Sequence, residues 1–135
     1  MDEIRGRVAV VTGGGDGIGR LGGQVVFVPY TIDGDVVRVK ITDIRKRYAK
    51  GRLTEILQPS DHRIIPLCAD YTHCGGCCYQ HINYSHQLLL KETQVRDAFE
   101  RIGKISGVPL YPVIPSPEPY HYRLKADFHI MNQRE

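Results

Sequence analysis

The first 57 residues contain closely spaced apolar stretches that are short, β-branched and without helical periodicity. Gly-rich stretches separate them, and Asp33-Gly34-Asp35 is typical of a hairpin turn. Five short strands of this kind predict a small OB-like β-barrel, which leaves no long exposed sheet edge. The expected strands cover residues 7–11, 18–21, 24–28, 35–42 and 47–57.

Three cysteines follow this β-rich region within ten residues. Cys68, Cys74 and Cys77 are spaced so that their thiolates can converge on one soft metal centre. The two glycines between Cys74 and Cys77 tolerate positive φ, which a C-x-x-C turn around a metal requires. The competing interpretation is that the three thiols are packed as small hydrophobic side chains. The spacing favours metal binding.

The identity of the metal stays open at this point. An iron–sulfur cluster is one interpretation, and zinc bound by three cysteines and either His73 or His81 is the other. Cys78 adjoins Cys77, so its side chain is expected to point away from a site that Cys77 enters. We interpret Cys78 as a spare thiol, with a substitute fourth ligand as the alternative.

The N-terminus is acidic and precedes no apolar segment that resembles a signal peptide. No apolar run approaches the length needed to cross a bilayer. We therefore expect a cytoplasmic monomer without a membrane partner, in which four cysteines indicate metal binding or catalysis rather than disulfides. A chain of 135 residues has room for one ordinary domain or two very small ones.

Basic residues are concentrated in one short stretch, in which Asp43 is the single acid. Such a stretch can neutralise phosphates, and a tyrosine within it can stack on an unpaired base. The alternative is a solvated sheet edge that only aids solubility. We predict RNA, and not DNA, as the partner. The predicted RNA-binding residues are Arg38, Lys40, Arg45, Lys46, Arg47, Tyr48, Lys50 and Arg52.

A helix is expected to begin at Asn83 or Ser85 and to end at Gly103 as its C′ residue. Its apolar stripe is expected to be core; the stripe consists of Leu88, Val95, Phe99 and Ile102. Five prolines then predict an extended connector before a half-buried strand over residues 122–131. Because no partner strand follows, we expect the sequence to be cut short and residues 108–135 to lack order. The expected divisions are 1–57, 58–107 and 108–135.

Residues 7–20, R-V-A-V-V-T-G-G-G-D-G-I-G-R, resemble the nucleotide loop of short-chain dehydrogenases. In that family a helix follows the glycines and directs its N-terminus at the phosphates. Here residues 20–29 contain two adjacent glycines, four β-formers and a proline, a combination that cannot form this helix. The family's Tyr-x-x-x-Lys pair is also missing, since Tyr48 is followed by Lys50. A dehydrogenase fragment is therefore a poorly supported alternative.

Several motifs, taken in order, resemble a different family. Residues 15–41 resemble the TRAM domain, a small OB-like RNA-binding barrel, and are followed by C-x5-C-G-G-C-x-x-Q-H. Together with Tyr84-x-x-Gln87-Leu88-x-x-Lys91 and Tyr122-Arg123-x-Lys125, they are similar to the N-terminal third of the SAM-dependent RNA 5-methyluridine methyltransferases that carry an iron–sulfur cluster.

This resemblance implies that the barrel holds ribosomal or transfer RNA. It also implies that Cys68, Cys74 and Cys77 ligate a [4Fe–4S] cluster whose fourth cysteine comes from a later segment. In the family, S-adenosyl-L-methionine and the catalytic cysteine and carboxylate belong to a C-terminal domain that no residue here matches. We therefore expect no catalytic residue in this chain and no activity from it alone. A free-standing metal-binding RNA module without catalysis is the alternative.

Overall fold

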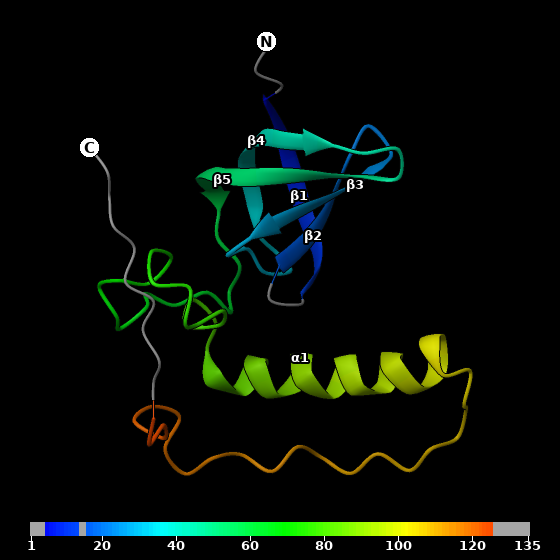
Figure 1. Ribbon diagram of the computed structural model, residues 1–135, viewed down its shortest axis with the longest axis vertical. Coiled ribbons are helices and arrows are strands. Elements are labelled where there is room, and N and C mark those ends of the chain that lie inside the picture. Colours follow the sequence, from blue (N-terminus) through cyan, green and yellow to red (C-terminus); the bar gives the residue numbers. More distant parts are fainter. Residues whose placement is uncertain (1–4, 14–15, 126–135) are drawn as a thin grey trace.

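The structure is a computed structural model that describes residues 5–13 and 16–125. Its first five elements are strands that hydrogen-bond in the order β1-β2-β3-β5-β4 and close into a barrel (Figure 1). Each expected strand boundary lies within two residues of an observed one. The strands are β1 Arg5–Gly13, β2 Asp16–Leu21, β3 Gln24–Pro29, β4 Val36–Ile44 and β5 Tyr48–Gln58.

The barrel core is made by alternate residues of neighbouring strands. Val26 and Val28 of β3, Val37 and Val39 of β4, and Ala49 of β5 are each no more than 3% exposed. Successive side chains of a strand point to opposite faces, so the residues between these positions lie on the outside of the barrel. The same alternation that builds the core therefore determines which side chains face solvent.

Strands β2 and β3 form a hairpin in which Leu21 is paired with Gln24. Gly22 and Gly23 form its two-residue turn with φ of 56° and 85°, a conformation that favours glycine. A dinucleotide-binding loop would continue into a helix at this point, whereas residues 16–29 are strand, turn and strand. The dehydrogenase alternative is therefore wrong.

Residues 59–83 join the barrel to the helix and contain the cysteines. The base of this segment is closed by a bridge between Arg63 and Ile82 and by hydrogen bonds from Ile64 N to His81 O and from Asn83 N to His62 O, both 2.9 Å. A second small core of Ile32, Ile82 and Leu90 lies at this junction. The residues between these closing bonds form the cysteine loop, which we define as residues 67–80.

Helix α1 spans Tyr84–Asp97 and continues as the π-helical turn η1, Ala98–Ile102. Asn83 is the N-cap, as expected, and its side-chain oxygen accepts a hydrogen bond from His86 N at 2.9 Å. Gly103 follows the π turn and ends the helical stretch, as expected; its φ is −73°, and its N–H donates to Ala98 O at 2.8 Å. Within the described residues, no helix has the length and apolar character that crossing a membrane demands.

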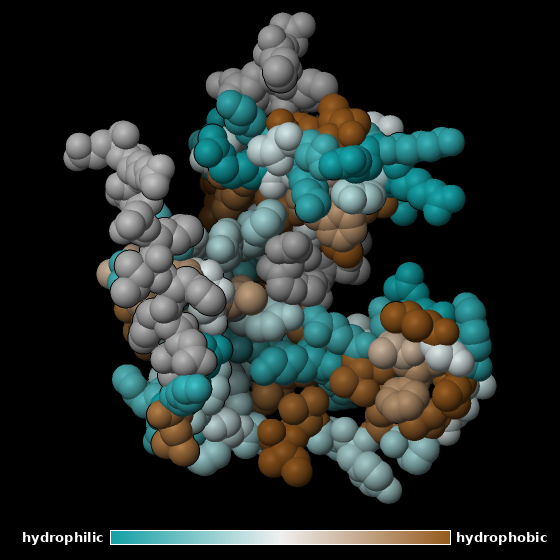
Figure 2. Space-filling model, viewed as in Figure 1, coloured by the Kyte–Doolittle hydropathy of each residue, from teal (hydrophilic) through white to brown (hydrophobic). Residues whose placement is uncertain are grey.

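The expected apolar face of this helix is not core in the described chain. Val95 is 47% exposed and Ile102 is 82% exposed, whereas Leu90, outside the expected stripe, is the buried residue of α1. The recorded contacts between the barrel and the helix involve its first half, where His86 lies beside Asp33 and Leu90 packs with Ile32. In Figure 1 the second half of the helix lies apart from the strands. Figure 2 shows apolar side chains gathered over the other end of the helix.

The connector after η1 runs back along α1 toward the cysteine loop (Figure 1). Ser116 N donates to the Tyr84 hydroxyl at 2.7 Å, and Arg123 Nη2 donates to Gly76 O at 3.3 Å. Residues 103–125 form neither helix nor strand. The expected strand over residues 122–131 is thus wrong for 122–125, which have no neighbouring strand among the described residues; its remainder lies outside them.

Candidate nucleic-acid groove and cysteine loop

A groove of about 940 Å³ lies on the outer surface of β3 and β5. Its lining combines aromatic rings, aliphatic carbon and two basic side chains with one residue of the cysteine loop. The lining residues are Phe27, Pro29, Tyr30, Thr42, Tyr48, Lys50, Gly51, Arg52, Leu53 and Thr72. The groove therefore lies where the barrel and the cysteine loop meet.

The parallel pairing of β3 and β5 places aromatic and basic side chains together. Phe27 is the register partner of Lys50, and its ring meets the Tyr48 ring edge-on with 5.6 Å between centroids. Tyr48, Lys50 and Arg52 share the outer face of β5 because they are two residues apart, while Ala49 between them is buried. These rings and cations thus line one surface.

The structure divides the eight predicted RNA-binding residues into different settings. Tyr48, Lys50 and Arg52 line the groove, whereas Arg38 forms an ion pair with Glu55 on the neighbouring strand. The others lie on β4 or in the turn after it: Lys40 is half-buried, Arg45 Nε donates to Asp43 Oδ2 at 2.9 Å, and Lys46 and Arg47 are exposed. Figure 2 shows hydrophilic side chains gathered at the end of the sheet where β4 turns into β5.

The cysteine loop contacts the barrel through Tyr30. The Tyr30 ring packs edge-on against Tyr71 with 5.4 Å between centroids, and its hydroxyl donates to Thr72 O at 3.5 Å. Tyr30 and Thr72 have φ of 63° and 77°, which side-chain-bearing residues adopt only where the surroundings hold them there. The barrel residue Tyr30 and the loop residue Thr72, which line the groove where the two parts meet, therefore hold each other in place.

All four cysteines are free and exposed on the cysteine loop. Gly75 has a φ of 72° in the turn between Cys74 and Cys77, as a C-x-x-C turn requires. A Cβ at Gly76 would lie 3.3 Å from the Cys74 sulfur, so the glycine leaves room around that thiol. The donor chemistry therefore fits a thiophilic metal centre.

The loop does not gather these donors in its described conformation. No three Cys, His, Asp or Glu side chains within residues 5–13 and 16–125 are close enough together to hold a metal ion. Cys68 N donates a hydrogen bond to Gln80 Oε1 at 3.2 Å, which joins the two ends of the loop. Binding a metal through several cysteines thus requires the loop to draw their sulfur atoms together.

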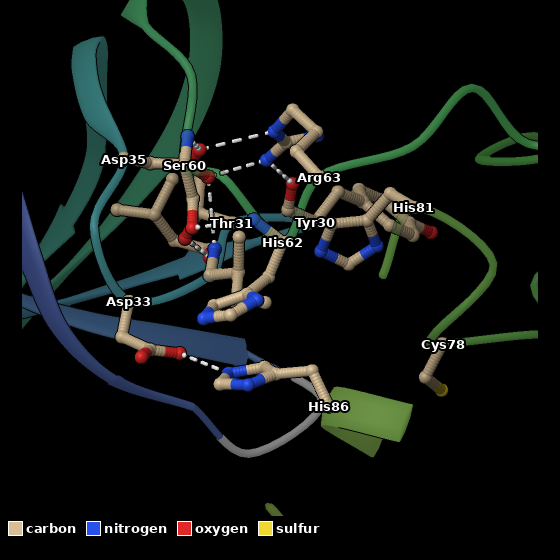
Figure 3. Close-up of polar contacts among 12 residues, drawn as sticks. Tyr30, Thr31, Asp33, Asp35, Ser60, His62, Arg63, Cys78, His81 and His86 are labelled. Atoms are coloured by element: carbon tan, nitrogen blue, oxygen red, sulfur yellow. Dashed lines mark hydrogen bonds and ion pairs between the residues drawn. The ribbon is translucent and has the colours of Figure 1, made fainter. Parts of the chain in front are cut away.

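A buried ion pair joins the barrel to the segment that leads into the cysteine loop (Figure 3). Asp35 accepts hydrogen bonds from Ile32 N and Ser60 N, both 2.9 Å, and from the guanidinium of Arg63 through both carboxylate oxygens. Arg63 Nη2 also donates to Tyr30 O at 3.0 Å. We call this set the Asp35–Arg63 clamp. It holds the backbone of Tyr30, a lining residue of the groove.

The pKa of Asp35 is lowered although burial by itself raises it, because hydrogen bonds from Arg63, Ser60 and Ile32, and the charge of Arg63, outweigh that burial. From the sequence, Asp33 and Asp35 were expected to be turn residues only. Gly34 between them does form the turn, with a φ of 88°, but the Arg63 partner was missed. Its 28-residue separation from Asp35 left no local signal.

A second polar cluster, built around the buried His81, lies on the other side of Arg63 (Figure 3). The Tyr71 hydroxyl donates to Cys78 O at 2.9 Å and lies 2.6 Å from Nδ1 of His81, which is 2% exposed. Burial, and then the positive charge of Arg63, lower the pKa of His81 to about 4. His81 is therefore neutral at physiological pH in the described structure, and its Nδ1 is engaged with Tyr71, whereas His73 is exposed.

Two more histidines link the barrel turn to the start of α1. His86 Nε2 lies 3.1 Å from Asp33 Oδ1, and the His86 ring stacks on His62 with 3.8 Å between centroids (Figure 3). Like the Asp35–Arg63 clamp, this contact joins residues more than twenty positions apart. Together they connect the barrel, the segment that leads into the cysteine loop, and the helix.

Comparison with known proteins places the barrel in a defined class: residues 6–54 match the TRAM domain. The match covers the strands that form the groove, apart from the last residues of β5.

Relatives extend the similarity through the cysteine loop and helix. Proteins named uncharacterized RNA methyltransferases are 43% identical over 121 residues in Nostoc sp. and 35% identical over 125 residues in Halalkalibacterium halodurans. These matches cover 90% and 93% of this chain but only 26% and 27% of the relatives. The chain thus corresponds to the N-terminal part of proteins named RNA methyltransferases and spans about a quarter of their length.

A solved structure agrees with this correspondence. The tRNA (uracil-54, C5)-methyltransferase of Pyrococcus abyssi, in complex with S-adenosyl-L-homocysteine, is 28% identical with a TM-score of 0.50. The similarity covers 82% of this chain and 24% of that protein. The resemblance inferred from the sequence motifs is confirmed by these relatives and by the TRAM match.

Proposed function

We propose that this chain is the RNA-binding and iron–sulfur-binding N-terminal portion of an enzyme that methylates C5 of a uridine in ribosomal or transfer RNA. The observation that carries the proposal is the groove, where Phe27 and Tyr48 lie beside Lys50 and Arg52. Proteins commonly bind single-stranded RNA with aromatic rings, on which the bases stack, and with neighbouring cations, which neutralise the phosphates. The TRAM match and the named activity of the Pyrococcus abyssi relative support this assignment.

The cysteine loop, in this proposal, holds a [4Fe–4S] cluster through Cys68, Cys74 and Cys77. Three exposed thiols and the turn at Gly75 support it. When bound, the cluster would brace the loop through iron–thiolate bonds, and its fourth ligand would come from outside this chain. Cys78 is assigned no ligand role. The burial and hydrogen bonding of His81 argue against a zinc site that uses this histidine.

Methyl transfer itself is assigned to the remainder of the parent enzyme, which would take its methyl group from S-adenosyl-L-methionine. The residues described here supply RNA contact and a scaffold for the cluster. We further propose that the parent enzyme acts in the cytoplasm as a monomer.

The cluster assignment predicts that replacing Cys77 and replacing its neighbour Cys78 have different effects on the iron and sulfide content of the chain. Purified without oxygen, the chain is expected to contain iron and acid-labile sulfide, with broad visible absorption. Cys77→Ser is expected to lose most of both because a cluster ligand is gone, whereas the matched control Cys78→Ser keeps them. Metal analysis and the visible spectrum measure this. Zinc without iron, or equal losses in the two variants, would contradict the assignment.

The RNA assignment predicts that Lys50 and Arg52 of the groove contribute more to RNA affinity than Arg38, which is paired with Glu55. Lys50→Gln combined with Arg52→Gln is expected to weaken RNA binding because fewer phosphates are neutralised. The slope of log K against log salt is expected to flatten by about 0.7 for each phosphate of a single strand that is no longer neutralised. Fluorescence anisotropy across a salt series measures both quantities.

Arg38→Gln is the matched control for the groove cations, since Arg38 is engaged with Glu55 outside the groove. It is expected to change the affinity and the salt slope little. A loss in this control equal to that of the groove variant would argue for a diffuse basic surface in place of the groove.

A further inference from the structure

We propose that the groove on β3 and β5 receives an unpaired base of a looped or bulged RNA strand, with Tyr48 as its stacking surface. This inference rests on the proposed RNA-binding function and adds the kind of RNA structure that the site selects. Paired RNA, whose bases stay within the helix, is expected to lack access to the groove.

The composition of the groove argues for a base over a phosphate chain. Pro29, Leu53 and the aromatic rings line this part of the groove with carbon, against which a phosphate would lose its hydration without gaining hydrogen bonds. A base offers flat faces that stack on aromatic rings and polar edges that can form hydrogen bonds. The volume of about 940 Å³ lies within the range of about 300–1,000 Å³ that small-molecule sites occupy.

The position of the cations complements this occupant. Lys50 and Arg52 lie on the same face of β5 as Tyr48 and are both exposed. Neither forms an ion pair within the part of the chain that the structure describes. A base that stacks on Tyr48 therefore brings its flanking phosphates toward two available positive charges, which favours a nucleotide over an uncharged aromatic ligand.

The aromatic wall is held in place before any RNA binds. Tyr48 packs against Phe27, and Tyr30 is held by the Arg63 bond to its carbonyl and by its contacts with the cysteine loop. Prearranged side chains lose less conformational entropy on binding. Tyr30 and Thr72 also place polar groups at the boundary with the loop, where the edge of a base can form hydrogen bonds.

Three labelled two-stranded RNA duplexes of matched length, none with a hairpin loop, test the proposal by fluorescence anisotropy with the full chain. One is fully paired, one has a single bulged base, and one has an abasic nucleotide at the bulge. The wild type is expected to prefer the bulged RNA. Tyr48→Ala is expected to weaken that complex roughly tenfold to a hundredfold and the other two by less than about twofold.

Two further variants guard against a folding effect, with circular dichroism as the check. Tyr48→Leu keeps apolar contact with Phe27 but removes the aromatic face, so the same selective loss is expected; Tyr48→Phe keeps the preference. Tyr111→Ala, which alters an 83%-exposed tyrosine outside the groove, is the matched control and leaves binding unchanged.

The outcomes separate this inference from the proposed function. Equal binding of all three duplexes, or an equal loss on all three in Tyr48→Ala, would overturn the base-binding role while RNA binding stands. Failure of the wild type to bind any of the three RNAs would overturn both the base-binding role and the proposed RNA-binding function.

Discussion

Replacing Arg63 with methionine is expected to lower the free energy of unfolding by about 3–5 kcal/mol. The substitution removes the cationic partner of Asp35, whose side chain is fully buried, and leaves its carboxylate with only the two backbone donors. Removing one member of a buried ion pair is costly because the other charge stays buried and uncompensated. Urea unfolding measures the loss.

Two comparisons test whether the unpaired buried charge of Asp35 causes the loss of stability in Arg63→Met. Asp35→Asn combined with Arg63→Met removes both charges and is expected to be more stable than Arg63→Met alone. Arg38→Met breaks a partly exposed pair with Glu55 and is expected to cost no more than about 1 kcal/mol. An Arg63→Met loss as small as that of Arg38→Met would show that the clamp contributes no more than a surface pair.

The clamp also connects stability to the groove. Because Arg63 holds the carbonyl of Tyr30, its loss is expected to loosen the wall that Tyr30 forms and to weaken RNA binding as well. Arg38→Met, whose site lies away from the groove, provides the comparison for that measurement too.

Acidification from pH 6.5 to about pH 4 is expected to lower the free energy of unfolding by up to about 3 kcal/mol through His81. The pKa of His81 falls from 6.5 to about 4 in the folded chain, because burial and the charge of Arg63 disfavour the imidazolium. Between these pH values the unfolded chain binds a proton at this histidine and the folded chain does not. Stability is therefore full above pH 6.5 and declines as the pH falls toward 4.

His81→Gln is expected to flatten this part of the pH profile, since glutamine does not titrate. His73→Gln, which replaces an exposed histidine of the cysteine loop, is the matched control and should preserve the wild-type slope. Urea unfolding at a series of pH values measures the slopes. A slope in His81→Gln as steep as in the wild type would assign the effect to other groups.

A separate loss is expected under more acidic conditions. The pKa of Asp35 lies below its ordinary value of 3.8, so the stability that this carboxylate contributes is present above pH 3.8 and is lost as the pH falls further. Most of the His81 window lies above the range in which Asp35 titrates, so the His81 effect is best measured between pH 6.5 and about pH 5.

Features governed by neighbouring residues could be predicted from the sequence. Alternating β-branched residues and glycine turns located the strands to within two residues, and Asn83 was recognised as a possible N-cap. The motif order identified the family resemblance that the TRAM match and the named relatives confirm. The cluster ligands Cys68, Cys74 and Cys77 stay a prediction.

Features that depend on distant residues could not be predicted in the same way. The helix stripe has the period of a core face, yet Val95 and Ile102 are exposed because nothing among the described residues covers them. The basic stretch indicated one RNA surface, but cross-strand pairing gives Arg38 an acidic partner and brings Phe27 beside Lys50. The order of charged residues along a chain does not show which residue of another strand will lie beside each of them.

The sequence by itself determined the strand positions, the TRAM resemblance and the cysteine spacing, since each depends on local periodicity or on a short motif. Only the tertiary structure decided that Asp35 meets Arg63, that His81 is buried, and that Tyr48 and Thr72 line one groove. Those outcomes join residues between about ten and thirty positions apart. These residues come together only when the barrel closes and residues 59–83 pack against it. Local sequence patterns do not predict such contacts.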